Sequence, residues 1–222
     1  MSTSGTTTFN PDVAALIEEA FDRAGYEGRS GYEYRTAVRS LNFLMSEWSN
    51  IGLNLWAVDQ QTQALTASDG QYDLATDTVD IIDAVIRIDS SDYRIERIGV
   101  GSWASISNKS QTSNRPNQYY VERLLTPRVN LWPVPDNSSA SLIYWRLRRI
   151  QDAGTADKTM DVPYRFLSAM AAGLSWKLYQ KKRGQYDINK AKELKDDYTE
   201  LLGLAMSEDR GRESFFIYPR IR

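Results

Sequence analysis

The segment whose residue types come closest to an enzymatic arrangement is the serine-rich stretch 99–110, which also contains one lysine. A serine beside a lysine base can act as a nucleophile, and the turn from Gly99 to Gly101 has two of the glycines of a phosphate-binding loop. The turn lacks the third glycine and a clear strand-to-helix context. Because serines near a lysine are also common in surface loops, we do not expect catalysis here.

Three aspartates spaced three residues apart, Asp77, Asp80 and Asp83, are the second candidate for chemistry. Carboxylates can bind a hard cation or flank a glycosidic bond. The spacing of a calcium loop is absent, however, and nothing else marks these positions. We therefore interpret them as the solvated face of a strand and its lead-in loop.

The chain of 222 residues contains no cysteine and no histidine. Disulfides, thiolate zinc sites and cysteine nucleophiles are excluded, and the usual general base and the commonest neutral metal ligand are missing. We expect a protein that is not an enzyme, with no catalytic residue, no metal site and no cofactor.

Arginines and aromatic residues are concentrated between residues 115 and 150, a segment that contains six arginines and only two acidic residues. These are the ingredients of a nucleic-acid surface, but protein interfaces are enriched in the same residue types. The chain is acidic overall, with a pI of about 5.4, which favours the protein interface. The candidate interface residues are Arg123, Arg128, Arg146, Arg148 and Arg149.

The two parts of the sequence differ in charge. Residues 1–100 carry 7 basic and 16 acidic side chains, a balance of -9, whereas residues 101–222 carry 20 basic and 13 acidic ones, a balance of +7. Two copies could therefore attract each other head to tail. The alternative is that both charged regions are simply solvated.

The apolar spacing predicts an α+β protein, an antiparallel bundle of four main helices with a β-rich insertion between helices 2 and 3 and an extended C-terminal arm. We expect an N-terminal helical pair at 1–53, the insertion at 54–160, a C-terminal helical pair at 161–207 and a docking arm at 208–222. The first helix is expected to begin at Asn10-Pro11 and to stop at Gly25, and Ser30 with Glu33 forms a capping box. Asp187 can cap the last helix. The expected bundle core is Val38, Leu41 and Trp48 packed against Leu167, Met170 and Leu174.

Within the insertion, an alternating pattern predicts a strand with Ile82, Ala84, Ile86 and Ile88 on one face. Residues 128–132 and 141–149 have the pattern of a hairpin joined by a long loop. Prolines in that loop favour a position at the edge of a sheet.

The end of the sequence, ESFFIYPRIR, combines aromatic and β-branched residues after a polar, glycine-containing stretch at 208–212. Such residues favour an extended conformation, and an extended arm can add to a partner's sheet edge or groove. The predicted docking residues are Phe215, Phe216, Ile217, Tyr218, Arg220, Ile221 and Arg222. The alternative is that the arm folds back on its own subunit.

The longest apolar runs are only a few residues long, whereas a membrane span needs roughly 20 apolar residues. The first residues also lack the basic and apolar regions of a secretory signal. We expect a protein that is neither secreted nor bound to a membrane.

Three stretches together resemble the head-to-tail adaptor (connector) proteins of short-tailed bacteriophages, of the tail tubular protein A type. They are RSLNFLMSEWSNIGLNLW at 39–56, QYYVER at 118–123 with LWPVPD at 131–136, and DVPYRFLSAMAAGL at 161–174. The resemblance extends from about Asn10 to Leu204. It rests on packing residues in a given order and not on a single diagnostic motif.

The resemblance implies a structural virion protein, assembled in the host bacterial cytoplasm, that forms a homo-oligomeric ring, usually of twelve subunits. The ring would lie between the portal protein of the capsid and the tail nozzle protein, with double-stranded DNA passing through its centre without sequence-specific binding. The family has no catalytic residues. In this setting the arm would dock on the portal or on a neighbouring subunit, and the arginines listed above would face a neighbouring subunit or the nozzle.

Two other classes of function remain as alternatives. A virion-associated cell-wall lytic enzyme would need a pair of carboxylates in a cleft. A DNA-binding regulatory protein would need a basic recognition helix. The strongest helical candidates for such a helix, residues 177–183 and 190–195, are amphipathic, and we expect their basic residues to face outward.

Overall fold

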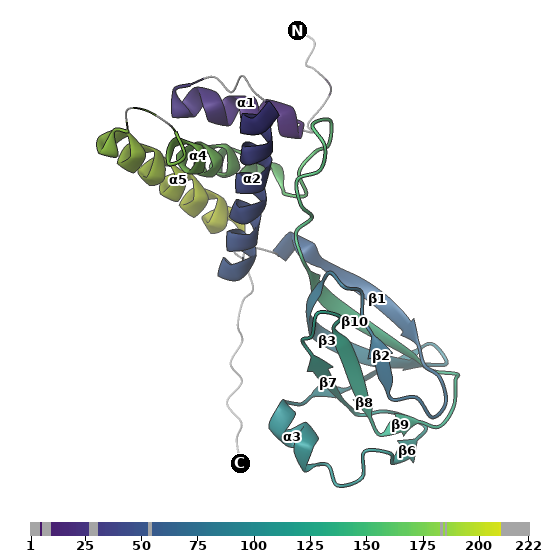
Figure 1. The fold of residues 1–222 in the computed structure, drawn as a ribbon. Helices are drawn as coiled ribbons and strands as arrows, with labels where there is room; N and C mark the ends of the chain where they lie inside the picture. Colours follow the sequence, from purple (N-terminus) through teal and green to yellow (C-terminus); the bar gives the residue numbers. More distant parts are fainter. Residues whose placement is uncertain are drawn as a thin grey trace, which may run out of the picture. The chain divides into compact units, whose positions relative to one another are not determined.

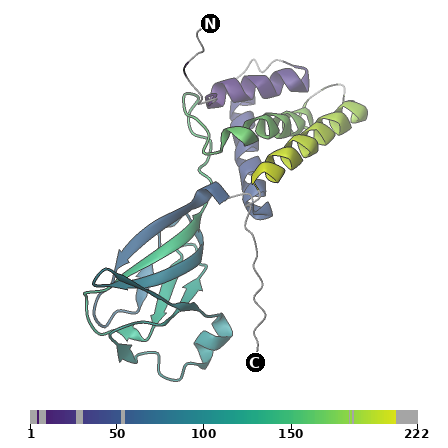
Figure 2. The ribbon, with the colours of Figure 1, turned by 180° about the vertical axis from the view of Figure 1, so that it is seen from behind.

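The structure is a computed structural model that describes residues 5, 10–26, 31–52, 55–182, 184 and 186–209. The chain divides into two compact units (Figures 1 and 2). The β unit contains the described residues of 54–150, and the helical unit contains those of 1–53 and 151–222. The described part is thus a mixed α+β protein, as the sequence predicts. The predicted cap Ser30 and residues 210–222 of the predicted arm lie outside the described residues. Residues 208 and 209, also predicted to belong to the arm, are the end of the last helix.

The β unit has two four-stranded sheets. The first has the order β1 (Val58–Ala64), β10 (Ser141–Arg148), β3 (Thr78–Ile88) and β4 (Ser91–Arg94). The second has the order β2 (Gln71–Asp73), β8 (Arg128–Trp132), β7 (Gln118–Glu122) and β5 (Glu96–Arg97). Smaller elements complete the unit: η1 (Leu55–Ala57), α3 (Val100–Ser105) and the parallel pair β6 (Thr112–Ser113) and β9 (Val134–Pro135).

One apolar core holds the two sheets together. Side chains from β3 and β10 of the first sheet and from β2, β7 and β8 of the second belong to a single buried cluster. Because successive residues of a strand point to opposite faces, β7, β8 and β10 contribute every second residue to this cluster. Its largest fully buried members are Ile81, Ile86, Tyr119, Leu131 and Leu142.

The hairpin expected between residues 128–132 and 141–149 is wrong. The first segment, β8, pairs with β7 and β2, whereas the second, β10, pairs with β1 and β3 in the other sheet. Both strands are central, because each has a neighbouring strand on either side in its own sheet. Between them lies β9, which pairs with β6, and the connection that follows crosses from one sheet to the other. Pro135 lies in β9, which is an edge strand because its sheet has only two strands, so the predicted edge position holds for this proline.

The alternation expected along β3 is also interrupted. Trp145 pairs with Asp83, but the next residue, Arg146, pairs with Ile81, so Ile82 is the extra residue of a β-bulge. The bulge reverses the two faces of the strand. Ile81 is therefore buried in the core and Ile82 is exposed, while Ala84 and Ile86 point inward as predicted.

The helical unit begins with α1 (Val13–Ala24). Its N-cap is Asp12, whose Oδ1 accepts a hydrogen bond from the amide of Ala15 at 2.7 Å. The expected start at Asn10-Pro11 is wrong, since the Asp12 carboxylate satisfies a free amide and also favours the positive end of the helix dipole. The predicted stop at Gly25 is confirmed by its left-handed φ of 75°. The apolar stripe that faces the core is Val13, Leu16, Ile17, Ala20, Phe21 and Ala24.

Residues 151–160 belong to the helical unit and not to the β unit, so the contacts divide the chain at residue 150 and not at 160. The amide of Val13 donates to the carbonyl of Lys158 at 2.8 Å, and the amide of Ala153 donates to Oδ1 of Asn42 at 2.7 Å. These hydrogen bonds tie the segment to α1 and to α2 (Gly31–Ile51).

Helix α4 (Leu167–Tyr179) is the centre of the helical unit. It follows the short helix η2 (Tyr164–Phe166) and is contacted by α1, by α2 (Gly31–Ile51) and by α5 (Ile188–Asp209). Side chains on nearly all of its faces are buried. Figures 1 and 2 show α2 crossing α1 and α4 steeply, so the antiparallel arrangement of a four-helix bundle is not shown.

The predicted core residues lie around this central helix. Leu41, Trp48, Met170 and Leu174 are fully buried, whereas Val38 and Leu167 are only partly buried. The Trp48 ring packs on Phe166, with 5.7 Å between ring centroids. The predicted cap of the last helix, Asp187, accepts a hydrogen bond from the amide of Asn189 at 2.8 Å.

Gly173 allows three helices to meet. A Cβ atom at this position of α4 would lie 2.8 Å from the Tyr198 ring of α5 and 3.0 Å from Leu44 of α2. The hydroxyl of Tyr198 in turn accepts a buried hydrogen bond from Nε1 of Trp48 at 2.9 Å. The ring is thereby held in place and cannot move aside for a larger residue.

Replacing Gly173 by alanine should therefore destabilise the helical unit. Overpacking typically costs about 1–3 kcal/mol, and alanine's better helix propensity returns at most about 1 kcal/mol. We expect a lower Tm in thermal unfolding followed by circular dichroism.

The matched control is Gly203→Ala in α5, where an added Cβ would meet no atom within 4 Å. This change should raise stability by roughly 0.5–1 kcal/mol through helix propensity alone. If the Gly173 variant were as stable as this control, the close approach of the helices would not exclude a Cβ atom at position 173.

Candidate interaction surfaces

The residues that could have formed an active site are engaged in local structure. The Lys109 ammonium donates to the carbonyl of Ile106 at 3.0 Å, and the Ser105 hydroxyl donates to the carbonyl of Ser102 at 2.8 Å. Neither interaction activates a nucleophile. Among the described residues, no group of three or more acidic, histidine or cysteine side chains is placed to hold a metal ion, and no helix is long and apolar enough to span a membrane.

The three candidate aspartates each pair with arginines of their own unit. Asp80 accepts from Arg97 at 2.7 Å and also from Arg123, while Asp83 lies 4.0 Å from Arg94. Asp77 pairs with Arg146 at 2.6 Å. The carboxylates are therefore neutralised one by one and do not gather around a cation or a bond to be cleaved.

Arg146 is part of the interior of the β unit and not of an interface, which corrects the prediction for this residue. Its side chain is only 8% exposed, and Nε lies 2.8 Å from Oδ1 of Asp59. The guanidinium also donates to Thr78 at 3.0 Å and to Asp77. A buried guanidinium needs such partners, because an unpaired buried charge is strongly destabilising.

This arginine changes the ionisation of its partner. Its hydrogen bonds hold the pKa of the Asp59 carboxyl below the usual range, against the opposing effect of partial burial. The pKa of Arg146 is in turn raised, first by the hydrogen bond to Asp59. The pair is therefore charged throughout the neutral and mildly acidic range.

The charge difference between the two parts of the sequence is largely neutralised inside the β unit. Residues 54–150 carry 11 acidic and 10 basic side chains, which leaves a balance of -1. Arginines from the later part of the sequence, such as Arg123, Arg128 and Arg146, pair with aspartates from the earlier part. Charges that were predicted to attract a second copy thus already form ion pairs within one chain.

The other candidate arginines lie nearer the surface. Arg123 is 64% exposed while it pairs with Asp80, and Arg128 lies 2.8 Å from Oδ1 of Asp73. Arg148 is partly buried and donates to the carbonyl of Arg149, which is itself exposed. These four arginines can contact a partner, although Arg123 and Arg128 already form ion pairs within the β unit.

Two leucines project from the loop between β7 and β8. Leu125 is 92% exposed and Leu124 is 58% exposed. We call them the leucine tip. The sequence analysis did not identify them, although adjacent leucines in a turn, where polar residues are usual, were a visible signal.

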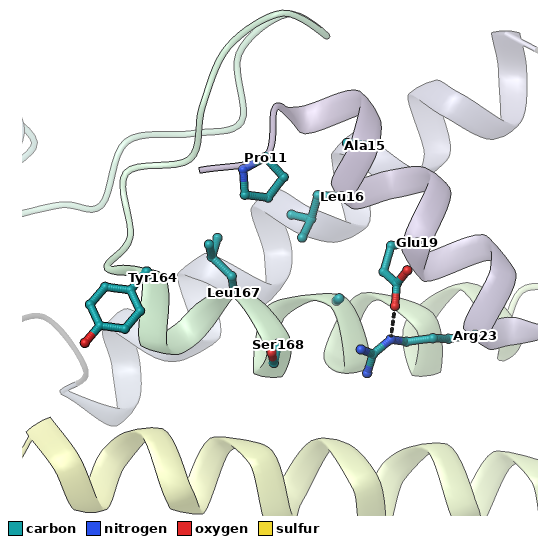
Figure 3. Close-up of a pocket in the computed structure, with 9 residues that line it drawn as sticks. Pro11, Ala15, Leu16, Glu19, Arg23, Tyr164, Leu167 and Ser168 are labelled. Carbon is teal, nitrogen blue, oxygen red and sulfur yellow. Dashed lines mark hydrogen bonds and ion pairs between the residues drawn. The ribbon is translucent and has the colours of Figure 1, made fainter. Parts of the chain in front are cut away.

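A groove lies between α1 and α4 of the helical unit (Figure 3). Its volume is about 590 Å³. Figure 3 shows Glu19 and Arg23 at one end, joined by a 2.7 Å ion pair, and Tyr164 toward the other end. We call it the α1–α4 groove; its lining residues are Pro11, Ala15, Leu16, Glu19, Arg23, Tyr164, Leu167, Ser168 and Ala171.

A smaller hollow of about 360 Å³ lies beside α2 and the end of α4 and contains two lysines. Lys181 donates to Oγ of Ser40 at 2.6 Å. Its pKa is lowered by burial first and by the nearby charges of Arg39 and Lys177 second. Lys182 lies over the rings of Tyr26 and Tyr179.

The predicted docking residues Phe215, Phe216, Ile217, Tyr218, Arg220, Ile221 and Arg222 lie outside the described residues. The described surface therefore offers three features for partners: the exposed arginines, the leucine tip and the α1–α4 groove.

Comparison with known proteins identifies what kind of molecule carries these surfaces. The model of the SU10 adaptor protein family matches residues 11–218. The chain belongs to this family. A search of the curated proteins finds no match.

Membership of the SU10 adaptor protein family confirms the coarser part of the resemblance seen in the sequence. The protein is a phage adaptor, a structural component of the virion that interacts with other virion components. An adaptor role agrees with a surface built for contacts. The narrower assignment to the tail tubular protein A type of short-tailed phages stays a prediction.

The Asp59–Arg146 pair generates a pH prediction for the β unit. Because the folded-state pKa of Asp59 is lowered, its contribution to stability is present above the unfolded-state pKa and is lost as the pH falls through the folded-state pKa. Asp59→Asn cannot ionise and should remove that contribution. The loss at pH 7 should be on the order of 1 kcal/mol, since solvent screens a carboxylate that is 35% exposed.

The measurement is the free energy of unfolding in denaturant from pH 7 to the acid range. The variant should show a flatter acid limb than the parent. Asp89→Asn, in the exposed turn between β3 and β4, is the control for the chemical change itself. Parallel curves for the Asp59 variant and the parent would contradict the assigned pairing.

Proposed function

We propose that this protein forms a ring at the head-tail junction of a short-tailed phage, as an adaptor of the tail tubular protein A type. The ring, of twelve copies, joins the portal protein to the tail nozzle protein. Double-stranded DNA passes through its centre. The protein has no catalytic role in this assembly.

The observation that carries the proposal is the extent of the family match. It runs from residue 11 to residue 218 and thus through both units. A match restricted to the helical unit would leave the β unit free for another function. Since the family's pattern covers both units, the adaptor role uses both.

The contacts of the proposed ring come from the described surfaces and from the predicted arm. Arg123, Arg128, Arg148 and Arg149 contact a neighbouring subunit or the nozzle, whereas Arg146 is reserved for the interior of the β unit. The arm residues 215–222 dock on the portal or on a neighbouring subunit.

The DNA path is lined by polar loops that do not read sequence. The candidates are residues 152–159 and 136–141. The first is anchored by backbone hydrogen bonds from α1, with Ala14 donating to the carbonyl of Ala156 at 3.1 Å. The second is held by local hydrogen bonds such as Ser139 to Oδ1 of Asn137 at 3.0 Å. Neither loop presents a basic helix, so contact with DNA remains weak and sliding is possible.

Electron microscopy of the purified protein, alone and mixed with portal rings, tests the proposal. We expect rings with a central hole that sit on the portal. Because exposed arginines take part in the proposed contacts, raising salt from about 0.1 M to 0.5 M should weaken or slow assembly. A protein that stays monomeric with the portal present would contradict the adaptor ring.

Deleting residues 214–222 tests the arm separately. If the arm docks on a partner, the shortened protein should keep a near-parental Tm and fail to join portal rings. The control replaces the same residues by a polar glycine-serine segment of equal length, which should behave like the deletion. A large loss of stability in the monomer would instead place the arm against its own subunit.

A further inference from the structure

Strand β1 forms an open edge of the first sheet. It pairs with β10 in an unbroken register, from Val58 opposite Leu147 to Ala64 opposite Ser141, and no described strand lies on its other side. Figures 1 and 2 show β1 along the outer margin of the β unit. An edge of this kind exposes backbone amides and carbonyls, which can pair with a strand from another chain.

A hydrogen bond just beyond the end of β1 shows which of its backbone groups face this edge. The amide of Leu65 donates to the carbonyl of Ala140 at 3.0 Å, one step beyond the last pair of the ladder. Bonded and non-bonded pairs alternate along an antiparallel ladder, so every second residue of β1 turns its backbone groups away from β10. These outward residues are Val58, Gln60, Thr62 and Ala64. Among the described residues, the side-chain amide of Gln63 caps one outward group, the carbonyl of Ala64, at 3.0 Å.

The other edges of the two four-stranded sheets carry features that hinder pairing with a further strand. The edge strands β4, β2 and β5 have only four, three and two residues. The part of β3 that β4 leaves uncovered is capped by side chains. The amide of Ile81 donates to Asp80 at 3.0 Å, and its carbonyl accepts from Arg97 at 2.8 Å. The amide of Ala84 donates to Asp83 at 2.9 Å.

Strand β1 lacks these protections. Its sequence, VDQQTQA, is seven residues long and contains no proline, lysine or arginine. Its single charged residue, Asp59, is already paired with Arg146 of β10. Proteins usually protect sheet edges with short strands, charges, prolines or bulges. The long, regular and nearly uncharged edge of β1 is therefore suited to receive a strand.

Residues 214–218, SFFIY, are the segment of this chain that fits the edge. The segment is uncharged, as is the middle of β1, and phenylalanine, isoleucine and tyrosine are among the residues that favour strands. At about 3.4 Å per residue, five residues extend about 17 Å and fit within an edge of roughly 24 Å. Pro219 follows and, because it has no amide hydrogen, ends the pairing.

The opposite end of the chain fits the edge less well. Residues 6–9, TTTF, also favour a strand, but they contain a single aromatic residue, whereas 215–218 contain three and an isoleucine. The backbone at Gly5 has a φ of 72°, which lies outside the extended region and interrupts a strand that would include it. The C-terminal segment therefore gains more from burial beside the sheet.

We propose that residues 214–218 of one copy add as a strand to the open edge of β1 in a second copy. This inference rests on the homo-oligomer of the proposed function and names the surface that receives the arm. The outward backbone groups of β1 hold the arm, and alternate arm side chains cover the partly exposed Gln61 and Gln63. Each copy gives its arm to one neighbour and receives an arm from the other, a contact that closes into a ring when the rotation permits.

The absence of cysteine in the sequence permits a direct test by disulfide trapping. One preparation carries Thr62→Cys, and five others carry a single cysteine substitution at each of residues 214–218. Each arm variant is mixed with the Thr62 variant, assembled with portal rings, oxidised and separated on a non-reducing gel. We expect the strongest disulfide-linked dimer from one arm position, a weaker one two residues away and none from the residues next to it. The reason is that side chains alternate between the faces of a strand, and only residues opposite each other lie within disulfide reach.

The matched control replaces Thr62→Cys by Ser91→Cys, an exposed position in β4 at the other edge of the same sheet. It should give no dimer above background. Rings that form without a dimer from the Thr62 variant would overturn the strand addition and leave the adaptor ring standing. Equal yields from all five arm positions would also overturn it, because a loosely held arm shows no alternation. No oligomer in any preparation would overturn both the contact and the ring.

Two further outcomes assign the edge to another occupant. If Thr62→Cys and an arm substitution in the same chain form a disulfide within the diluted monomer while the mixtures give no dimer, the arm pairs with its own sheet. If Thr8→Cys links to Thr62→Cys and no arm variant does, the N-terminal segment is the occupant. Either result overturns the proposal.

A second measurement does not depend on cysteine chemistry. Thr62→Pro removes one outward amide and no hydrogen bond to β10, and proline is tolerated at such a position of an edge strand. The variant should keep a near-parental Tm and raise the concentration needed for half-maximal assembly at least tenfold. Thr62→Val keeps the amide and is the matched control, which should assemble like the parent.

If Thr62→Pro fails to fold, Gln60→Pro makes the same test at the preceding outward amide. Equal assembly of a folded proline variant and the parent would overturn the proposal.

Discussion

The helical unit depends on the close approach of three helices at Gly173. With no side chain at this position, α4 comes near enough for the Tyr198 ring of α5 and Leu44 of α2 to fill the space that a Cβ would occupy. The same Tyr198 accepts the buried hydrogen bond of Trp48, which belongs to α2. The absence of a side chain at Gly173 lets α2, α4 and α5 approach one another, and the Trp48–Tyr198 hydrogen bond links α2 to α5. The steep crossing of α2 in Figure 1 is compatible with this point contact, because helices that meet at a glycine need no long shared seam.

The β unit is organised by a different constraint. Two sheets share one apolar core, and the chain must pass from one sheet to the other several times. Arg146 lies at the end of the central strand β10 and joins Asp59 of β1 to Asp77 beside β3. Its ion pairs link three neighbouring segments of the first sheet at a point where bulges interrupt the ladder. Arg146, which the sequence suggested as an interface residue, therefore stabilises the first sheet.

The contact surfaces of the described residues fit a phage adaptor. The described aspartates and lysines serve local structure, while exposed leucines, exposed arginines and an apolar groove remain for partners. A protein that links other virion components needs large, specific and mutually independent surfaces. Two units with separate cores provide them, because a change on one surface does not disturb the packing of the other unit.

The sequence by itself determined the features that depend on neighbouring residues. The apolar stripe and the glycine stop of α1, the burial of Trp48 and Leu41, the Asp187 cap and the β-rich character of the middle segment follow from local spacing and capping chemistry. The resemblance to phage adaptors also came from the order of such segments, and the family match confirms its coarser part.

Only the tertiary structure decided what depends on residues far apart in the chain. The partners of β8 and β10, the bulge that exposes Ile82 and the internal role of Arg146 are set by which strands meet, and local patterns are the same for several pairings. The α1–α4 groove is invisible in the sequence because its two walls are separated by about 150 residues. The sequence around Gly173 does not show that the Tyr198 ring of another helix packs against this glycine. Burial and pairing are properties of the folded chain, and the sequence states only which residues are able to take part in them.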